Sequence, residues 1–170
     1  MKILVADKIA DKGIEILRDN GFEVDVITGK NEEELIGLAP DYDAIIVRSQ
    51  SRITRAIIEA ATKLKIIGRA GVGVDNVDIE AATEKGVIVC NAPTSNVISA
   101  AEQAMTLMLA SARKTVAANN SMQAGKWERS KFKGNELYEK TLAIFGLGRI
   151  GGLVAERAKS FGMRLIGYDP

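Results

Sequence analysis

Three glycines and an aspartate near the end of this 170-residue sequence are spaced as in a dinucleotide-binding turn. The pattern Gly-x-Gly-x-x-Gly places glycine at Gly146, Gly148 and Gly151, and Asp169 ends the apolar run that follows. Gly146 permits a tight turn, Gly148 lets the backbone approach a diphosphate, and Gly151 lets a helix pack closely on a sheet. A carboxylate at Asp169 can accept hydrogen bonds from both hydroxyl groups of an adenosine ribose. The chemistry predicted by these residues is the binding of a dinucleotide.

Strand and helix patterns flank the glycines in the order that a dinucleotide-binding βαβ unit requires. The apolar run Thr141–Phe145 precedes the turn, a helical pattern covers 152–161, and a second apolar run covers 163–168. The first turn of this helix points unpaired N–H groups and the positive end of its dipole toward the phosphates. The carboxylate after the second run repels a 2′-phosphate, so NAD is favoured over NADP. The alternative is an ordinary βαβ corner whose glycines serve packing only.

A second group of residues has the composition of an anion site. Arg48 and Ser49 follow one apolar run, and Arg69 begins a turn that contains Gly71 and Gly73. Glycines in such a turn allow several backbone N–H groups to point toward one anion. Ligands of open α/β sheets collect at the carboxyl ends of the strands, where both arginines are expected. The sequence predicts a site for an anionic small molecule, although a tight turn beside two solvated arginines fits the same pattern.

Composition argues against several classes of function. The net charge is +1, which gives no electrostatic basis for binding nucleic acid or an anionic membrane, and no apolar run is long enough to span a bilayer. The chain has no histidine, the usual base for oxidising an alcohol at neutral pH, and no Cys/His cluster that would bind a metal. The single cysteine, Cys90, ends an apolar run and is expected to be a buried structural thiol. The expected location is the cytoplasm.

Short β-branched runs alternate with helical patterns over residues 1–95. They predict a flavodoxin-like α/β domain, which is a doubly wound parallel sheet with helices on both faces. The expected strands are Lys2–Ala6, Glu23–Ile27, Ala44–Arg48, Leu64–Gly68 and Val87–Cys90, and the expected helices are Ile9–Asn20, Glu32–Leu38, Thr54–Ala61 and Asp78–Lys85. Asn31 and Thr54 are expected to be helix N-caps, and Gly21 and Gly86 are expected to be C-cap glycines.

A hinge over residues 91–96 is expected to separate this domain from the rest of the chain. A long helix is predicted over Val97–Ala124, with Ser99 and Glu102 spaced as a capping box. Small residues and methionines on one face suit close helix packing, either in the core or at a contact between subunits. We expect residues 96–170 to be the start of a Rossmann NAD-binding domain, truncated after its first βαβ unit.

Several segments together resemble one enzyme family. These segments are 68–78, 91–93, 124–129, 146–151 and 160–170, and the resemblance extends over nearly the whole chain. On these residues the chain resembles the D-isomer-specific 2-hydroxyacid dehydrogenases, and among them the enzymes that oxidise 3-phosphoglycerate. Gly152 and the pair at 94–95 are small departures from the family pattern.

The resemblance implies NAD-dependent oxidation of 3-phospho-D-glycerate to 3-phosphohydroxypyruvate, the first step of serine biosynthesis. The residues implied in cofactor binding are Val72, Gly146, Gly148, Arg149, Ile150, Gly151 and Asp169. The residues implied in substrate binding are Arg48, Ser49, Arg69, Gly71, Gly73 and Arg129, the last at a neighbouring subunit's site. The family's catalytic arginine, glutamate and histidine lie beyond Pro170, so the 170-residue chain alone is expected to be inactive. A homodimer or homotetramer formed through the nucleotide domain is also implied.

Other functions fit part of the same sequence. One is a different D-2-hydroxyacid dehydrogenase that acts on glyoxylate or lactate. Another is an NAD-binding module without catalysis, and a third is an oligomerisation unit built around the long helix. Arg48, Arg69 and Arg129 favour a phosphorylated substrate over glyoxylate or lactate.

Overall fold

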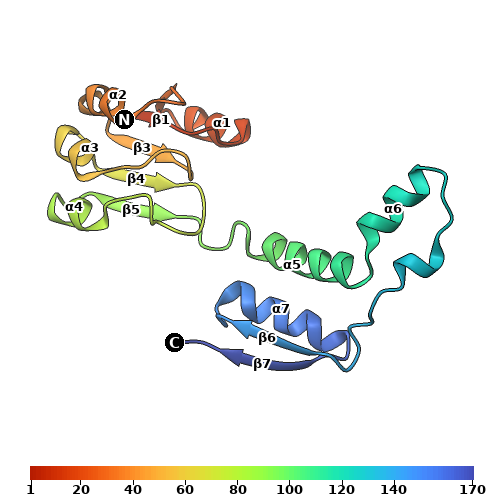
Figure 1. Ribbon diagram of the computed structural model, residues 1–170. Coiled ribbons are helices and arrows are strands. Elements are labelled where there is room, and N and C mark those ends of the chain that lie inside the picture. The colour runs from red at the N-terminus through yellow and green to blue at the C-terminus, as the bar shows by residue number, and fades with distance from the viewer. The chain divides into compact units, whose positions relative to one another are not determined.

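The computed structural model describes all residues from Met1 to Pro170 as two compact units, Met1–Ser95 and Asn96–Pro170 (Figure 1). Each unit has its own sheet and its own hydrophobic core. None of the helices combines the length and the apolar character needed to cross a membrane.

The first unit is built on a five-stranded sheet in which all neighbouring strands are parallel. The strands are β1 (Lys2–Val5), β2 (Glu23–Val26), β3 (Ala44–Val47), β4 (Ile66–Arg69) and β5 (Ile88–Asn91). Their order across the sheet is β2-β1-β3-β4-β5, which is the flavodoxin-like doubly wound order. The predicted fold class is confirmed, and the reversal of strand order lies between β1 and β3.

Helices cover both faces of this sheet. They are α1 (Asp11–Asp19), α2 (Glu32–Leu38), α3 (Arg55–Ala60) and α4 (Ile79–Glu84), with a 3₁₀ helix at Ala39–Asp41. Buried side chains of α2, α3 and α4 form one core cluster with the central strands, and partly buried side chains of α1 pack on a second cluster against the opposite face. The strands therefore carry apolar residues on both faces, as parallel sheets of this type require.

Local signals fix the ends of these helices. The side chain of Asn31 accepts a hydrogen bond from Glu34 N at 2.9 Å, and the Glu34 carboxylate accepts one from Asn31 N at 3.0 Å, which makes a complete capping box. Gly21 and Gly86 have φ values of 80° and 68°, so both predicted C-cap glycines are confirmed. Thr54 occupies the N-cap position of α3, but its hydroxyl donates to Glu32 and caps no backbone N–H.

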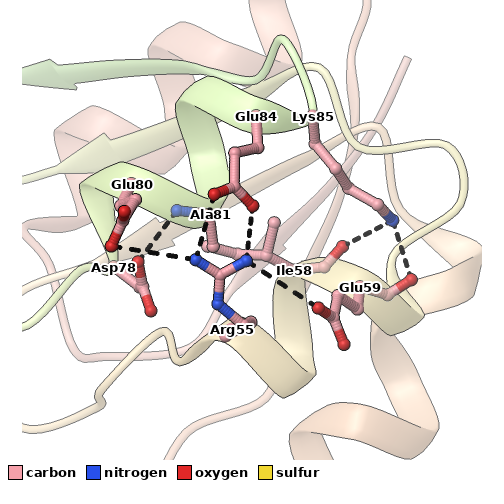
Figure 2. A network of polar contacts seen from close by, with 8 residues as sticks. All are labelled: Arg55, Ile58, Glu59, Asp78, Glu80, Ala81, Glu84 and Lys85. Atoms are coloured by element: carbon pink, nitrogen blue, oxygen red, sulfur yellow. Dashed lines mark hydrogen bonds and ion pairs between the residues drawn. The ribbon is translucent and has the colours of Figure 1, made fainter.

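Figure 2 shows the polar contacts that join α3 to α4 at the surface. The guanidinium of Arg55 donates to both carboxylate oxygens of Glu84, and its Nη2 lies 3.9 Å from Glu80 Oε2. Lys85 Nζ donates to two main-chain carbonyl oxygens at the C-terminal end of α3, at 3.0 and 2.7 Å. Because these ion pairs are largely exposed to water, they contribute little to stability. They fix the spacing of two helices over the core and lie apart from the polar residues discussed below.

The second unit contains two parallel strands and three helices. Its elements are α5 (Val97–Ala112), α6 (Thr115–Gln123), a 3₁₀ helix at Arg129–Phe132, β6 (Thr141–Phe145), α7 (Arg149–Ser160) and β7 (Arg164–Tyr168). Met105 on α5 forms a buried cluster with Ala158 on α7 and with Met163. The small residues and methionines of this helix were expected to lie either in the core or at a contact between subunits, and Met105 lies in the core. Ala104 on the same helix is exposed.

The predicted single helix over Val97–Ala124 is wrong, because the chain breaks at Lys114, which has a φ of 52°. The cause is a contact from a distant part of the chain. The carbonyl oxygen of Ala112 accepts a hydrogen bond from Asn135 N at 2.8 Å. This bond takes the place of the helical hydrogen bond that would continue α5. A Cβ atom at Gly134 would lie 2.5 Å from the same oxygen, which shows how closely the two segments approach.

Two smaller predictions also fail. Ser99 does not form a capping box with Glu102, because the helix begins after Asn96 and the Ser99 hydroxyl donates to Asn96 O at 3.1 Å. Cys90 is exposed rather than buried. It lies on β5, an edge strand of the sheet, where Ile88 is also exposed.

Candidate cofactor and substrate sites

The glycine turn of the second unit joins β6 to α7, and its three glycines differ in backbone conformation and in surroundings. Gly146 has a φ of 95°, which favours glycine over all residues with a side chain. A Cβ atom at Gly151 would lie 1.9 Å from the carbonyl oxygen of Gly146, so only glycine lets α7 pack this closely on the turn. A Cβ atom at Gly148 would meet no atom within 4 Å. Packing within the protein therefore does not explain Gly148, which borders open space.

The N-terminus of α7 presents uncapped backbone donors beside this open space. Gly148 is the N-cap residue, and no side chain caps the helix. The first helical hydrogen bond runs from Gly152 N to Gly148 O at 2.9 Å, so the N–H groups of Ile150 and Gly151 precede the helical ladder. Arg149 begins the same turn. Uncapped N–H groups at the positive end of a helix dipole form a site for phosphate.

Asp169 lies at the same turn. Strand β7 pairs in parallel with β6, so that Tyr168 lies beside Phe145, and Gly146 N donates to Tyr168 O at 2.8 Å. This pairing brings the next residue, Asp169, against the turn, where Oδ2 accepts a hydrogen bond from Leu147 N. The carboxylate is exposed and its Oδ1 makes no hydrogen bond within the unit. Open space, uncapped donors and an adjacent carboxylate together fit a dinucleotide.

The predicted substrate residues of the first unit lie at the carboxyl ends of adjacent strands. Arg48 and Ser49 follow β3 directly, and Arg69 is the last residue of β4, beside β3 in the sheet. Arg48 and Ser49 are exposed. The guanidinium of Arg48 donates to the main-chain oxygen of Lys8, beyond the end of β1, at 3.3 Å. The structure thus brings these residues to one edge of the sheet, which is the edge where open α/β sheets bind ligands.

The turn after β4 differs from the expected turn in which several backbone N–H groups point toward one anion. Neither Gly71 nor Gly73 has a positive φ, and Gly71 N donates to Arg69 O at 2.8 Å, so the amide of Gly71 is already used. The Arg69 guanidinium folds back over Gly71, where a Cβ atom would lie 1.6 Å from Nη1. A larger residue at this position would therefore displace the flexible Arg69 side chain. The main-chain oxygen of Val72, in the same turn, accepts a hydrogen bond from Asn91 Nδ2 at 2.6 Å.

The sequence analysis missed Asp7, a fully buried carboxylate at the end of β1. It accepts hydrogen bonds from Arg48 N at 2.6 Å, from Gln50 N at 3.2 Å and from the hydroxyl of Ser51 at 2.7 Å, and Ser51 N donates to it as well. Burial opposes ionisation, but the Ser51 hydroxyl and the backbone N–H groups outweigh it and hold the pKa of Asp7 below its ordinary value. An aspartate that directly follows the apolar run Ile3–Ala6 was the available signal.

Asn76 was the second residue missed. Its side chain is 8% exposed and its Nδ2 donates to the main-chain oxygens of Arg48 at 2.8 Å and Ser51 at 2.7 Å. Asn76 lies in the segment after β4 that also contains Gly71 and Gly73. The signal was its position within the glycine-rich turn, but sequence spacing does not show which strand end such a side chain reaches.

A family model for the D-isomer specific 2-hydroxyacid dehydrogenase catalytic domain matches residues 3–165, which is nearly all of this chain. The chain belongs to the D-isomer specific 2-hydroxyacid dehydrogenase family. Among its relatives is the D-3-phosphoglycerate dehydrogenase of Archaeoglobus fulgidus, which is 55% identical over all 170 residues. The chain covers 32% of that protein, so it spans about a third of the length of the curated relatives it matches.

Solved structures match this chain over its whole length. The TT0316 protein from Thermus thermophilus is 34% identical, with a TM-score of 0.91, and 57% of its chain is covered. The 3-phosphoglycerate dehydrogenase of Entamoeba histolytica, solved with bound NAD+, is 38% identical, with a TM-score of 0.79, and 54% of its chain is covered. Dependence on NAD is thus found within the family, in a relative that matches both units of this chain.

Arg129 is the one predicted substrate residue in the second unit. It begins the 3₁₀ helix Arg129–Phe132 and is exposed. Beside it lies an apolar groove of about 200 Å³ lined in part by Met122, Trp127 and Phe132.

The glycines and Asp169 were identified from their spacing in the sequence, whereas the buried polar residues Asp7 and Asn76 became visible only in the fold.

Proposed function

We propose that this chain binds substrate and cofactor in an enzyme that oxidises 3-phospho-D-glycerate to 3-phosphohydroxypyruvate with NAD. The observation that carries the proposal is the turn of the second unit, where the Asp169 carboxylate bonds to Leu147 N beside the uncapped N-terminus of α7. The names of the Archaeoglobus and Entamoeba relatives support the choice of substrate. The reaction is the first step of serine biosynthesis.

The second unit is proposed to hold NAD, which when bound supplies the acceptor for a hydride. The N–H groups of Ile150 and Gly151, together with the α7 dipole, bind the diphosphate, and Arg149 lies at the same turn. The missing side chain at Gly148 leaves room for the diphosphate to approach the backbone. Asp169 accepts hydrogen bonds from the adenosine ribose through the oxygen that Leu147 leaves available.

The first unit is proposed to bind 3-phosphoglycerate through its two anionic groups. Arg48 and Arg69 supply positive charge at the carboxyl ends of β3 and β4, and arginine pairs well with both carboxylate and phosphate. Ser49 adds a hydroxyl and a backbone N–H beside Arg48. The turn from Gly71 to Gly73 contributes the backbone N–H groups that remain after Gly71 N is paired with Arg69 O.

Removal of the hydroxyl proton is not assigned to this chain. Oxidation of an alcohol needs a base near neutral pKa, and histidine is the usual choice, but the sequence contains none. We therefore expect the 170-residue chain to bind ligands without catalysing the reaction at a useful rate.

The proposed function is tested by following NADH formation in the intact protein, meaning the whole protein to which these 170 residues belong. Its alternative substrates are 3-phosphoglycerate, D-lactate and unphosphorylated D-glycerate. We expect kcat/KM for 3-phosphoglycerate to be at least about a hundredfold higher than for the other two substrates. A substrate without the phosphate would leave the charges of the substrate-binding arginines unpaired. Equal or better turnover of D-lactate, or of glyoxylate in the reverse direction, would establish a different D-2-hydroxyacid dehydrogenase. NAD binding without any turnover would establish a non-catalytic module.

A substitution at Asp169 is expected to change cofactor preference. In Asp169→Asn the ribose loses a charged hydrogen-bond acceptor, so the Kd for NAD should rise roughly tenfold or more. The Kd for NADP should fall at the same time, because a 2′-phosphate no longer meets a carboxylate. Calorimetric titration with both cofactors measures the two effects, and Glu156→Gln, a neutralisation on an exposed position of α7, is the matched control. An unchanged ratio of the two Kd values would remove Asp169 from the cofactor site.

We also infer that the protein works in the cytoplasm as a homodimer or homotetramer. Large apolar side chains of the second unit are at least half exposed on its helices and on the loop after α6; they are Ile98, Leu107, Val116, Met122 and Trp127. Exposed apolar surface of this kind is typical of a contact between subunits.

A further inference from the structure

Two buried side chains hydrogen-bond to the backbone of the segment from Arg48 to Ser51, one as an acceptor and the other as a donor. Asp7, which is 1% exposed, accepts hydrogen bonds from the N–H groups of Arg48, Gln50 and Ser51. Asn76 donates to the carbonyl oxygens of Arg48 and Ser51. One side chain therefore satisfies the donors of this segment and the other satisfies its acceptors.

We infer that Asp7 and Asn76 are positioning residues that fix the Arg48–Ser51 segment in the conformation that binds the substrate's anionic group. The inference rests on the proposed function, in which Arg48 and Ser49 contact the substrate. Asp7 and Asn76 do not reach the surface themselves, since both are buried. They act through the backbone that carries Arg48 and Ser49.

The pattern of hydrogen bonds shows what this arrangement leaves for a ligand. Of the four N–H groups from residue 48 to residue 51, only that of Ser49 does not donate to Asp7. Ser49 and Arg48 are exposed, and the Arg48 guanidinium makes a single hydrogen bond, to Lys8 O. The N–H of Ser49, its hydroxyl and most of the Arg48 donors are therefore available to one anion at the edge of the sheet.

The orientation of the Asn76 side chain leaves one of its buried polar atoms without a hydrogen bond, which is unfavourable for stability. Its Oδ1 is buried and has no hydrogen-bond partner, while both contacts of the amide are made by Nδ2. Burying an unpaired polar atom is unfavourable. The position needs a double donor toward the Arg48–Ser51 backbone, and asparagine supplies it without charge.

Asn76 also connects the two strand ends that carry the arginines. It belongs to the turn that begins at Arg69, and its own main-chain oxygen accepts a hydrogen bond from Ile53 N at 2.8 Å. Through Asn76 the position of the Arg48 segment depends on that of the Arg69 turn. Preorganisation of this kind lowers the entropy that a bound anion would otherwise have to remove.

The test uses steady-state kinetics of the intact protein carrying Asp7→Asn or Asn76→Asp. Both changes preserve side-chain size. Asp7→Asn replaces one acceptor oxygen with a donor group, and Asn76→Asp replaces the donor group with an acceptor oxygen. We expect the KM for 3-phosphoglycerate to rise about tenfold or more, with kcat changed less than about threefold and the KM for NAD unchanged. A purely structural role would lower the amount of folded enzyme, and hence the maximal rate, without raising the KM for 3-phosphoglycerate.

Asp43→Asn is the matched control. Asp43 also accepts a backbone hydrogen bond, from Lys2 N at 2.8 Å, but it lies before β3, at the opposite edge of the sheet. We expect this variant to keep the KM for 3-phosphoglycerate of the parent protein. If Asp7→Asn does not fold, Ser51→Ala removes only the hydroxyl bond to Asp7 and should raise that KM about threefold.

The outcomes separate the two hypotheses. If the unsubstituted protein does not oxidise 3-phosphoglycerate, the proposed function fails and the positioning role falls with it. If the unsubstituted protein does, but the Asp7, Asn76 and Ser51 variants keep its KM for 3-phosphoglycerate, the positioning role alone is rejected. A rise in KM equal to that of Asp43→Asn also rejects it.

Discussion

Gly148→Ala is expected to weaken NAD binding about a hundredfold while leaving the fold of the second unit intact. A Cβ atom at this position meets no protein atom within 4 Å, and its φ of −62° suits alanine. Loss of glycine from an N-cap costs less than about 1 kcal/mol. The new methyl group instead occupies the space through which a diphosphate approaches the uncapped N–H groups of α7. The defect should therefore lie in the ligand complex and not in the free protein.

Gly151→Ala is expected to damage both binding and stability. Its Cβ atom would lie 1.9 Å from Gly146 O and 3.0 Å from Gly146 C, both of which are backbone atoms that cannot rotate away. Either α7 or the turn must move, at a cost of about 1–3 kcal/mol or more for an overpacked site. Movement of the helix also displaces the N–H groups of Ile150 and Gly151, so NAD affinity should fall with stability.

Gly152→Ala is the matched control in the same helix. Its nearest neighbour would be Leu147 O at 4.0 Å, an ordinary contact. Alanine is favoured over glycine in a helix, so the variant should be more stable by roughly 0.5–1 kcal/mol and should bind NAD within about twofold of the parent. Calorimetric titration with NAD and thermal unfolding without NAD measure the three variants. Normal NAD affinity in Gly148→Ala would contradict the proposed path of the diphosphate.

The parts of this fold that follow from local patterns were predictable from sequence. The strands of the first unit are apolar on both faces, so Ile3–Val5 and Ala44–Val47 indicated a covered parallel sheet before any contact was known. The turn from Gly146 to Gly151 was also predictable, because Gly146 and Gly151 answer constraints set by the backbone of the turn itself. Asp169 followed from its place at the end of the next strand.

The features that sequence reasoning missed depend on contacts between distant segments. The helix break at Lys114 follows from Gly134 and Asn135, which lie against Ala112 and take its carbonyl oxygen. Nothing in the local sequence around Lys114 is a strong helix breaker, so propensity favoured one continuous helix. Asp7 is similar, because its partners at 48–51 are more than forty residues away. Strand order, which local patterns do not give, brings them together.

The largest stability effect in the first unit is expected from Asp7→Asn. We predict a loss of about 3 kcal/mol in the free energy of unfolding at neutral pH, the size typical of breaking a buried, charge-assisted hydrogen-bond network. The carboxylate accepts hydrogen bonds from three backbone N–H groups and from the Ser51 hydroxyl. An asparagine has only one acceptor oxygen, and its amide N–H groups would face these donors.

The effect should depend on pH in a defined direction. Burial alone would raise the pKa of Asp7, but the hydrogen bonds from Ser51, Arg48 and Gln50 lower it by more than burial raises it. The pKa in the folded protein therefore lies below the ordinary value of 3.8. A carboxyl group whose pKa falls on folding stabilises the protein above the unfolded pKa, and this stabilisation is lost as the pH falls through the folded pKa. Asparagine does not titrate. The difference in stability between parent and variant should therefore be greatest at neutral pH and shrink below about pH 4.

Urea unfolding of the parent and of Asp7→Asn, from about pH 7 down to about pH 3, measures this difference directly. Other carboxyl groups with lowered pKa, such as Asp25 and Asp43, are present in both proteins, so their contributions cancel in the comparison. Asp43→Asn, measured in parallel, should show a smaller difference because Asp43 is less buried than Asp7. A difference between parent and Asp7→Asn that instead grew as the pH fell would mean that Asp7 is already protonated in the folded protein. The charge that organises the Arg48–Ser51 backbone would then be absent, and neutral hydrogen bonds alone would have to hold that segment.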